Sequence, residues 1–249
     1  MTAVRRLHLP CDREARLRYV REHFPAATGP DLPDTLAGGR VEGLRRLHAI
    51  DGLAYERSRN FLDGAVTRLS PYLRHGCLTL REAFDHVLEK TDGRAQKLLF
   101  EFAWRDYWRQ VWYWQGEAIL SDMEPAKVLR GTQPLPQDVL DGETGLPCMD
   151  AFIHDLRTQG HVHNHARMWF AAWLLHWRKV DWRAAADWYV AELLDGDIAS
   201  NHLSWQWVAS TFSAKPYIFN KENLARYSGE RYCRDCRCAC PFDASYEQL

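Results

Sequence analysis

The chain of 249 residues lacks several features that mark common protein classes. No apolar run approaches the roughly 20 residues that span a bilayer, and the N-terminus MTAVRRLHLP has no apolar signal core. We therefore expect a cytoplasmic protein without membrane contact, whose seven cysteines begin in the reduced state. Its 32 basic and 33 acidic residues nearly cancel, so the net charge gives no sign of nucleic-acid binding. The net charge does not exclude a local basic groove.

Strand signals are also missing. There is no sustained alternation of apolar and polar residues, no G-x-G-x-x-G, no P-loop, no internal repeat and no low-complexity tract. Apolar residues instead recur every three or four positions, most clearly across residues 97–114. We predict an all-α fold, with a long loop at 121–147 and helices over 12–23, 40–54, 80–89, 97–114, 149–159, 163–177, 182–194 and 199–211.

Three parts are predicted along the chain. Residues 1–40 combine a charged helical stretch with the Pro/Gly-rich loop FPAATGPDLPDTLAGG and form an approach segment. Residues 41–228 form one helical domain, and residues 229–249 form a cysteine-rich tail.

The segment DGDIASNHLSWQW (195–207) is the most informative stretch of the chain. Asn201 follows Asp197 by one helical turn, and Trp205 follows Asn201 by another, so these side chains share a helix face. Such a face suits an aromatic cofactor with a polar rim. An Asp N-cap before a Trp-rich core helix explains the same residues equally well.

Two earlier stretches have the same double interpretation. VTRLSPYL (66–73) offers hydroxyls and backbone N–H groups ahead of a proline, which suits a phosphate or an ordinary capped turn. LLFEFAWRDYWRQ (98–110) places Glu101 and Arg105 one turn apart beside Trp104, as a surface salt bridge on an aromatic stripe also does.

Two clusters suggest metal ligands. His161, His163 and His165 lack a carboxylate or cysteine at ligand spacing, so we do not favour a metal there. Four C-terminal cysteines lie within eight residues, and Cys148 stands far upstream as a fifth thiol. They can bind zinc or an iron–sulfur cluster, or form a reduced tail or adventitious disulfides. The metal hypothesis concerns Cys233, Cys236, Cys238 and Cys240.

These stretches, together with GETGLPCMDAFIHDLRTQGHVHNHARM (142–168), occur in the order found in the photolyase/cryptochrome family. The chain resembles the helical, FAD-binding half of that family over about residues 38–227. The resemblance implies one FAD in a U-shaped pose and no N-terminal antenna domain. Val66, Leu98 and His165 depart from the family pattern, which has a hydroxyl, a tryptophan and an arginine there.

The resemblance also assigns roles to residues. Catalytic roles fall to Glu101, Asn164 and Asn201, with Asn201 facing flavin N5. Contacts to damaged DNA are implied for Glu101, Trp104, Arg105, Asn164, Met168 and Trp207. Contacts to FAD are implied for Tyr55, Thr67, Arg68, Leu69, Ser70, Arg105, Asn164, Arg167, Asp195, Asp197 and Asn201.

Electron transfer to the flavin is implied for Trp205 and then Trp182. The third tryptophan of the family chain is expected near Leu129, where this sequence has none. Either the series of electron donors ends early, or another residue such as Trp177, Trp188 or Tyr189 takes over.

The implied function is light-driven repair of cyclobutane pyrimidine dimers, in which reduced FAD passes an electron to the flipped-out lesion in UV-damaged DNA. The asparagine at 201 favours repair-type chemistry. The alternatives are a cryptochrome-like blue-light receptor that signals through a protein partner, a (6-4) or iron–sulfur relative, and a flavoprotein without photochemistry. A separate antenna protein is a further candidate partner.

Overall fold

The computed structural model describes residues 8–26 and 37–249, which belong to two compact units divided between Leu32 and Pro33. In the first unit, helix α1 (Arg13–His23) begins after Asp12, whose carboxylate accepts a hydrogen bond from the backbone N–H of Ala15. The helix predicted over 12–23 is therefore confirmed. Residues 1–7 and 27–36 of the predicted approach segment lie outside the described residues. The predicted division into 1–40, 41–228 and 229–249 stays a prediction.

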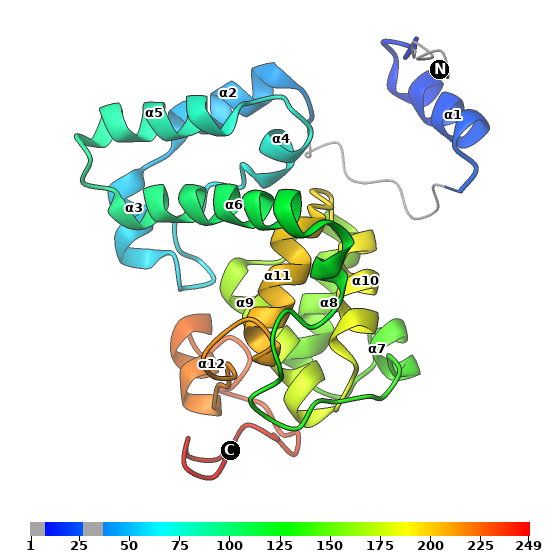
Figure 1. The fold of residues 1–249 in the computed structure, drawn as a ribbon, viewed down its shortest axis with the longest axis vertical. Helices are drawn as coiled ribbons and strands as arrows, with labels where there is room; N and C mark the ends of the chain where they lie inside the picture. The colour runs from blue at the N-terminus through cyan, green and yellow to red at the C-terminus, as the bar shows by residue number, and fades with distance from the viewer. Residues whose placement is uncertain (1–7, 27–36) are drawn as a thin grey trace. The chain divides into compact units, whose positions relative to one another are not determined.

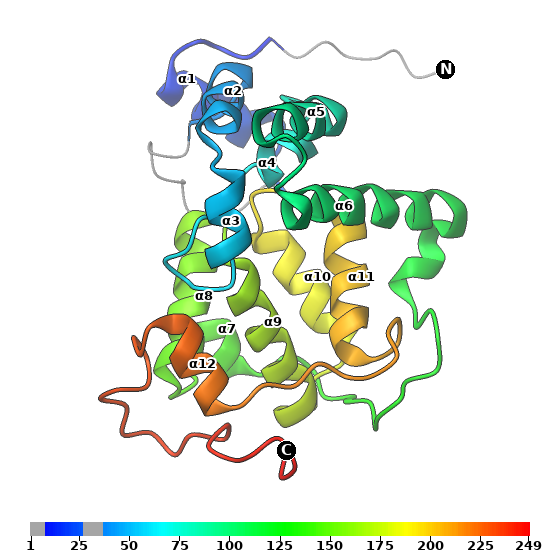
Figure 2. The ribbon, with the colours of Figure 1, turned by 90° about the vertical axis from the view of Figure 1, so that its left-hand side faces the viewer.

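Helices alone build the described part of the second unit, apart from an isolated bridge between Gln133 and Val180 (Figures 1 and 2). The all-α prediction is confirmed. None of the described helices is long and apolar enough to cross a membrane. The elements are α2 (Arg40–Ala49), α3 (Gly52–Ser58), α4 (Ser70–Arg74), α5 (Leu80–Thr91), α6 (Gln96–Gln115), η1 (Gly116–Leu120), α7 (Gln137–Asp141), α8 (Pro147–Gln159), α9 (Asn164–Ala172), η2 (Trp173–Trp177), α10 (Trp182–Glu192), α11 (Ile198–Ala209) and α12 (Lys221–Ser228).

The helix predicted over 40–54 is wrong as a single element, because the chain breaks between α2 and α3. Asp51 caps α3 by accepting a hydrogen bond from the N–H of Ala54 at 2.8 Å. The next residue, Gly52, packs so closely on α5 and α6 that an added Cβ would meet Ala95 at 2.7 Å. The break lets α3 turn beneath α6.

The segment predicted as one helix over 163–177 changes type part-way along. Helix α9 ends at Ala172 and continues as one π-helical turn, η2. The periodicity of apolar residues does not distinguish the two, since residues 169–175 are all buried across the junction. Four short elements were not predicted: α4, η1, α7 and α12.

Two hydrophobic cores stabilise the second unit. The smaller one gathers residues of α2, α4, α5 and the N-terminal half of α6, around Leu47, Leu69 and Leu98. The larger one gathers α8 to α12, around Trp169, Phe170 and Trp182. Helix α6 contacts α3 and α5 on one side and α11 on the other, so it joins the two cores (Figure 2).

Candidate functional site

A cavity of about 490 Å³ lies between the two cores. Its size is typical of pockets for small molecules and cofactors. Every residue that the sequence assigned to FAD or DNA lines this one cavity, as does Trp205. These residues are Tyr55, Thr67, Arg68, Leu69, Ser70, Glu101, Trp104, Arg105, Asn164, Arg167, Met168, Asp195, Asp197, Asn201 and Trp207.

Arg105 of α6 and Asp197 at the start of α11 form a buried ion pair in the cavity wall. Their side chains are only 10% and 7% exposed, and Arg105 Nη2 lies 2.6 Å from Asp197 Oδ2. Asp197 also caps α11, because Oδ1 accepts a hydrogen bond from the N–H of Ser200 at 2.9 Å. Burial lowers the pKa of Arg105, and the nearby carboxylate of Asp197 opposes that shift. Asp197 therefore has both of the roles considered in the sequence analysis: it is the N-cap of α11 and it lines the cavity.

Ser70 links Arg105 to the second aspartate. Its hydroxyl accepts a hydrogen bond from Arg105 Nη1 at 3.0 Å and donates one to Asp195 Oδ2. Just before Ser70, Arg68 has a φ of 49°, a left-handed conformation that a residue with a Cβ seldom adopts. A left-handed residue in a turn can aim successive backbone N–H groups at one point, where they bind an anion. Strained residues of this kind cluster at functional sites.

The start of α9 supplies a histidine whose tautomer can be assigned. His163 Nδ1 accepts a hydrogen bond from the N–H of His165 at 3.1 Å. Burial, followed by the charge of His165 and Arg167, lowers the pKa of His163 to about 4, so the ring is neutral near pH 7. A neutral ring that accepts at Nδ1 must carry its proton on Nε2. His163 lines the cavity, and its Nε2–H is buried without a hydrogen-bond partner.

Aromatic side chains surround the mouth of the cavity. Trp104 and Trp108 of α6 have ring centroids 5.0 Å apart, and Trp108 lies 5.8 Å from Phe212. Trp104 is 47% exposed and Trp207 is 38% exposed, although both line the cavity. Half-exposed indoles at a cavity mouth provide faces on which planar groups can stack.

Glu101 lies one helical turn before Arg105 and close to Arg59, with 4.0 Å between Arg59 Nε and Glu101 Oε1. Partial burial raises the pKa of the Glu101 carboxyl, and the charges of Arg59 and Lys97 oppose that shift.

On α11, Asn201 and Trp205 are joined by a hydrogen bond from the indole Nε1 to Asn201 Oδ1 at 3.2 Å. Asn201 Nδ2 donates to the carbonyl of Ala186 at 3.0 Å. One lone pair on Oδ1 and one N–H on Nδ2 remain for a ligand. The predicted shared face of Asp197, Asn201 and Trp205 is thus present, since all three line the cavity.

Unpartnered polar atoms provide a test of whether a polar cofactor fits. Six buried side-chain nitrogen and oxygen atoms of the described residues have no hydrogen-bond partner, and five of them belong to residues of this cavity. Unsatisfied buried groups are costly and rare, so a cavity whose residues carry five of them fits a polar ligand and not an apolar one. The five atoms are Arg105 Nε, His163 Nε2, Tyr189 OH, Asp195 Oδ1 and Ser200 Oγ.

Two groups of sequence-predicted residues do not line the cavity. Trp182 is fully buried in the larger core behind α11. Of the C-terminal cysteines, Cys233, Cys238 and Cys240 pack against the same core, and Cys236 Sγ lies 3.1 Å from Cys238 Sγ. Burial raises the pKa of Cys148 to about 12, and nearby Cys240 and Cys233 contribute to that shift. Within 8–26 and 37–249, no group of three or more side chains has metal-ligand geometry.

The cavity also contains residues that the sequence did not reveal as site residues. Trp108 follows Trp104 by four positions on α6, while Ser200 and Ser204 lie on the α11 face that carries Asp197 and Asn201. Helical spacing was the available signal for these three. His161, whose pKa burial lowers to about 3, has no comparable signal because it precedes α9 in a loop.

Comparison with known proteins identifies the family. A family described as the FAD binding domain of DNA photolyase matches residues 98–237. The chain belongs to the photolyase/cryptochrome family. It is 32% identical to a deoxyribodipyrimidine photo-lyase of Halobacterium salinarum over 226 residues, which cover 85% of this chain and 46% of that protein. It is 31% identical to a cryptochrome DASH of Vibrio parahaemolyticus, with 76% and 46% covered.

Solved structures of photolyase/cryptochrome proteins agree with this assignment. A Synechocystis sp. PCC6803 cryptochrome superimposes with a TM-score of 0.70 at 26% identity, covering 80% of this chain and 46% of that protein. The 249-residue chain described here spans about half the length of the curated relatives that it matches.

Proposed function

We propose that the chain binds one FAD in the cavity between its two cores and uses it for light-driven repair of cyclobutane pyrimidine dimers in DNA. The observation that carries the proposal is the collection of five unpartnered buried polar atoms in a cavity already bordered by the Arg105–Asp197 ion pair. The family match and the photo-lyase names of several relatives support it. When bound, reduced FAD supplies the photoexcited electron that splits the dimer.

The cavity residues divide into two groups in this proposal. Asp195, Asp197 and Asn201 hold the ring edge, while Thr67, Ser70 and the His163 N–H hold the polar linker. Tyr55, Arg68, Leu69 and Arg167 complete the cofactor contacts.

At the mouth, Trp104 and Trp207 stack on the extruded bases, with Met168 and Asn164 beside them. The raised pKa of Glu101 widens the pH range over which its carboxyl can donate a hydrogen bond to a base carbonyl.

Two alternative functions require different residues at the mouth of the cavity. A cryptochrome-like receptor, which the cryptochrome DASH relatives favour, needs the flavin contacts and a protein partner but not Glu101. A (6-4) enzyme is less well supported, because the family resemblance places histidine where this chain has Asn164. Binding of a separate antenna protein is compatible with each of them.

Replacing Glu101 by alanine tests the repair proposal. With chemically reduced FAD bound, we expect dimer removal from an irradiated oligonucleotide under blue light to fall roughly 10- to 100-fold, the loss of one hydrogen bond to a buried polar group. Glu101→Gln should keep most of the activity, because its amide still donates. Asp106→Ala, an exposed change on the same helix outside the cavity, is the control.

Flavin content, measured for each variant, shows whether the cofactor site is intact. Equal repair by wild type and Glu101→Ala at equal flavin content would contradict the substrate role of Glu101. No repair by the wild-type protein would favour the receptor.

Metal binding at the C-terminal cysteines is a separate hypothesis. The interaction of Cys148 with Cys233 and Cys240 supports a gathering of thiols in the fold. In the described ranges, however, no three side chains are arranged as metal ligands. Zinc or an iron–sulfur cluster therefore stays a prediction, and no step of the repair proposal passes through it.

A further inference from the structure

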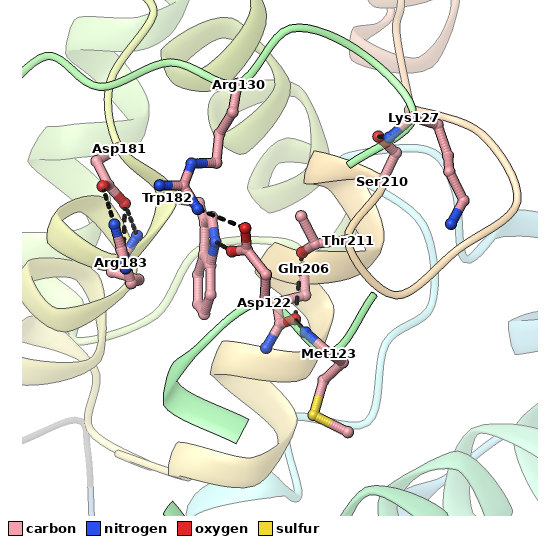
Figure 3. A network of polar contacts seen from close by, with 10 residues as sticks. All are labelled: Asp122, Met123, Lys127, Arg130, Asp181, Trp182, Arg183, Gln206, Ser210 and Thr211. Carbon is pink, nitrogen blue, oxygen red and sulfur yellow. Dashed lines mark hydrogen bonds and ion pairs between the residues drawn. The ribbon is translucent and has the colours of Figure 1, made fainter. Parts of the chain in front are cut away.

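Trp182 has an acidic hydrogen-bond partner although it is fully buried. Its indole Nε1 donates to Asp122 Oδ1 at 2.7 Å, the length typical of a hydrogen bond to a charged acceptor. The other carboxylate oxygen of Asp122 pairs with Arg130 Nη1. Figure 3 shows the carboxylate between the indole and the guanidinium. Asp122 keeps 26% of its side chain exposed, so it connects a buried ring to water.

The loop that carries Asp122 is fastened to α11 by a residue next to Trp205. Gln206 is fully buried and its Oε1 accepts from the N–H of Met123 at 2.9 Å. Its Nε2 donates to the carbonyl of Ile119 at 2.8 Å. These two bonds hold the backbone on both sides of Asp122, and Figure 3 shows Gln206 beside Met123. The carboxylate is therefore built into the fold and is not a mobile surface group.

The far end of the same loop is fastened beside Trp182. Gln133 donates its backbone N–H to Lys179 and accepts one from Asp181, both at 2.9 Å. Asp181 caps α10, which begins at Trp182. The path of residues 121–133 is thus fixed at both ends around the indole.

Aromatic side chains do not continue outward from Trp182 through this loop, because residues 121–147 contain no Trp, Tyr or Phe. In the described part of the chain, the ring contact of Trp182 is to His202, at 6.3 Å between centroids. Tyr189 instead lies 5.6 Å from Trp205 and 6.1 Å from Trp188, on another branch. Trp177 packs on Phe219 and Phe242. An electron vacancy that reaches Trp182 therefore has no further aromatic donor in the loop.

We propose that Asp122 is the proton acceptor that stabilises oxidised Trp182, so that electron donation to the flavin ends at this residue. The inference rests on the proposed FAD-binding function. The family resemblance places Trp182 directly after Trp205 in the order of electron donors. On that order Trp182 loses one electron toward the cavity by way of Trp205, and the light-excited oxidised flavin is the oxidant. The Nε1–H bond of Trp182 breaks and an Oδ1–H bond forms on Asp122, which leaves a neutral indole radical and a neutral carboxylic acid.

Loss of the proton makes return of the electron slow, because the proton must return as well. A thiol reductant then supplies one electron to the Trp182 radical, and the proton moves back from Asp122 to Nε1. Arg130 keeps Oδ1 aimed at the indole throughout, since it holds Oδ2.

Transient absorption of the FAD-loaded protein after a blue flash tests this proposal. In wild type, we expect the band of a tryptophan cation radical to convert into that of a neutral radical, more slowly in D2O. In Asp122→Asn, which keeps the shape and an acceptor for Nε1, the cation radical should persist and recombine. Steady photoreduction with a thiol should then fall at least about 100-fold, the lower end of the range for proton transfer by a positioned group.

Asp181→Asn is the matched control, because Asp181 pairs with Arg183 in the same region and has no bond to the Trp182 indole (Figure 3). It should behave as wild type, and Trp182→Phe should abolish the neutral-radical signal. A neutral radical formed equally in Asp122→Asn and wild type overturns the proposal, as does a signal that survives Trp182→Phe. Repair by chemically reduced wild-type protein is measured separately, so its failure counts against the proposed function and not against Asp122.

Discussion

At the scale of single residues, the cavity contains charge states that the sequence does not reveal. His161 and His163 line it beside Arg68 and Arg167, and burial together with these cations lowers their pKa values to about 3 and about 4. Both rings are therefore neutral in the folded protein at pH 5, where exposed histidines are protonated.

Folding stability should depend on pH through these two histidines. Their pKa values are lowered in the folded state, so the unfolded chain binds more protons between about pH 6.5 and pH 4. The free energy of unfolding should therefore decrease as the pH falls through that range.

Urea unfolding at pH 7, 6, 5 and 4.5 measures the effect, and the variant with both His161→Asn and His163→Asn should lose less stability. Identical pH slopes for the two proteins would contradict the shifts. His8→Asn, in the first unit and exposed, is the control.

Residue spacing alone predicted one helix face of the candidate site, and the family resemblance supplied most of its other residues. Asp197, Asn201 and Trp205 follow a helical repeat, and the structure brings them to one cavity with Arg105 of α6. The bond from Arg105 to Ser70, which joins residues 35 positions apart, has no local pattern and could not be predicted. The roles assigned by family resemblance remain predictions.

At the scale of elements, most of the main helices were predictable because apolar residues recur every three or four positions, as they do over residues 97–114 of α6. Breaks and short elements were not. The division between α2 and α3 depends on the close packing of Gly52 on Ala95, the residue just before α6, a contact between residues far apart in sequence. The 121–147 loop was predicted as irregular, and its docking on α10 and α11 follows from hydrogen bonds that no periodicity indicates.

Gly131 tests that docking. An added Cβ would meet the backbone carbon and oxygen of Lys179 at 2.3 Å, where no side chain can move aside. Gly131→Ala should therefore lower the free energy of unfolding by about 1–3 kcal/mol. It should also move the loop away from Trp182. Chemical denaturation measures the first effect, and faster amide exchange at Gln133 and Asp181 reports the second.

Gly38→Ala is the control, because an added Cβ there meets nothing within 4 Å. Equal stability and equal exchange for Gly131→Ala and wild type would show that the loop does not depend on this close approach.

At the scale of the whole molecule, the described second unit consists of two cores joined by α6, with the cavity between them. The smaller core supplies the turn at 66–70, and the larger one supplies α9 and α11. Neither core contains the site alone. A ligand that bonds to both should therefore hold them together and stabilise the fold by mass action.

The measurement that tests the account most directly is FAD binding by the purified chain, followed by the absorption spectrum in the dark and after blue light with a thiol. We predict one FAD per chain and flavin bands that bleach on illumination. Arg105→Met, which leaves Asp197 without its buried partner, should weaken binding at least about tenfold. Arg183→Met, at a more exposed ion pair outside the cavity, should bind as wild type does. A folded wild-type chain that takes up no FAD would contradict the central claim.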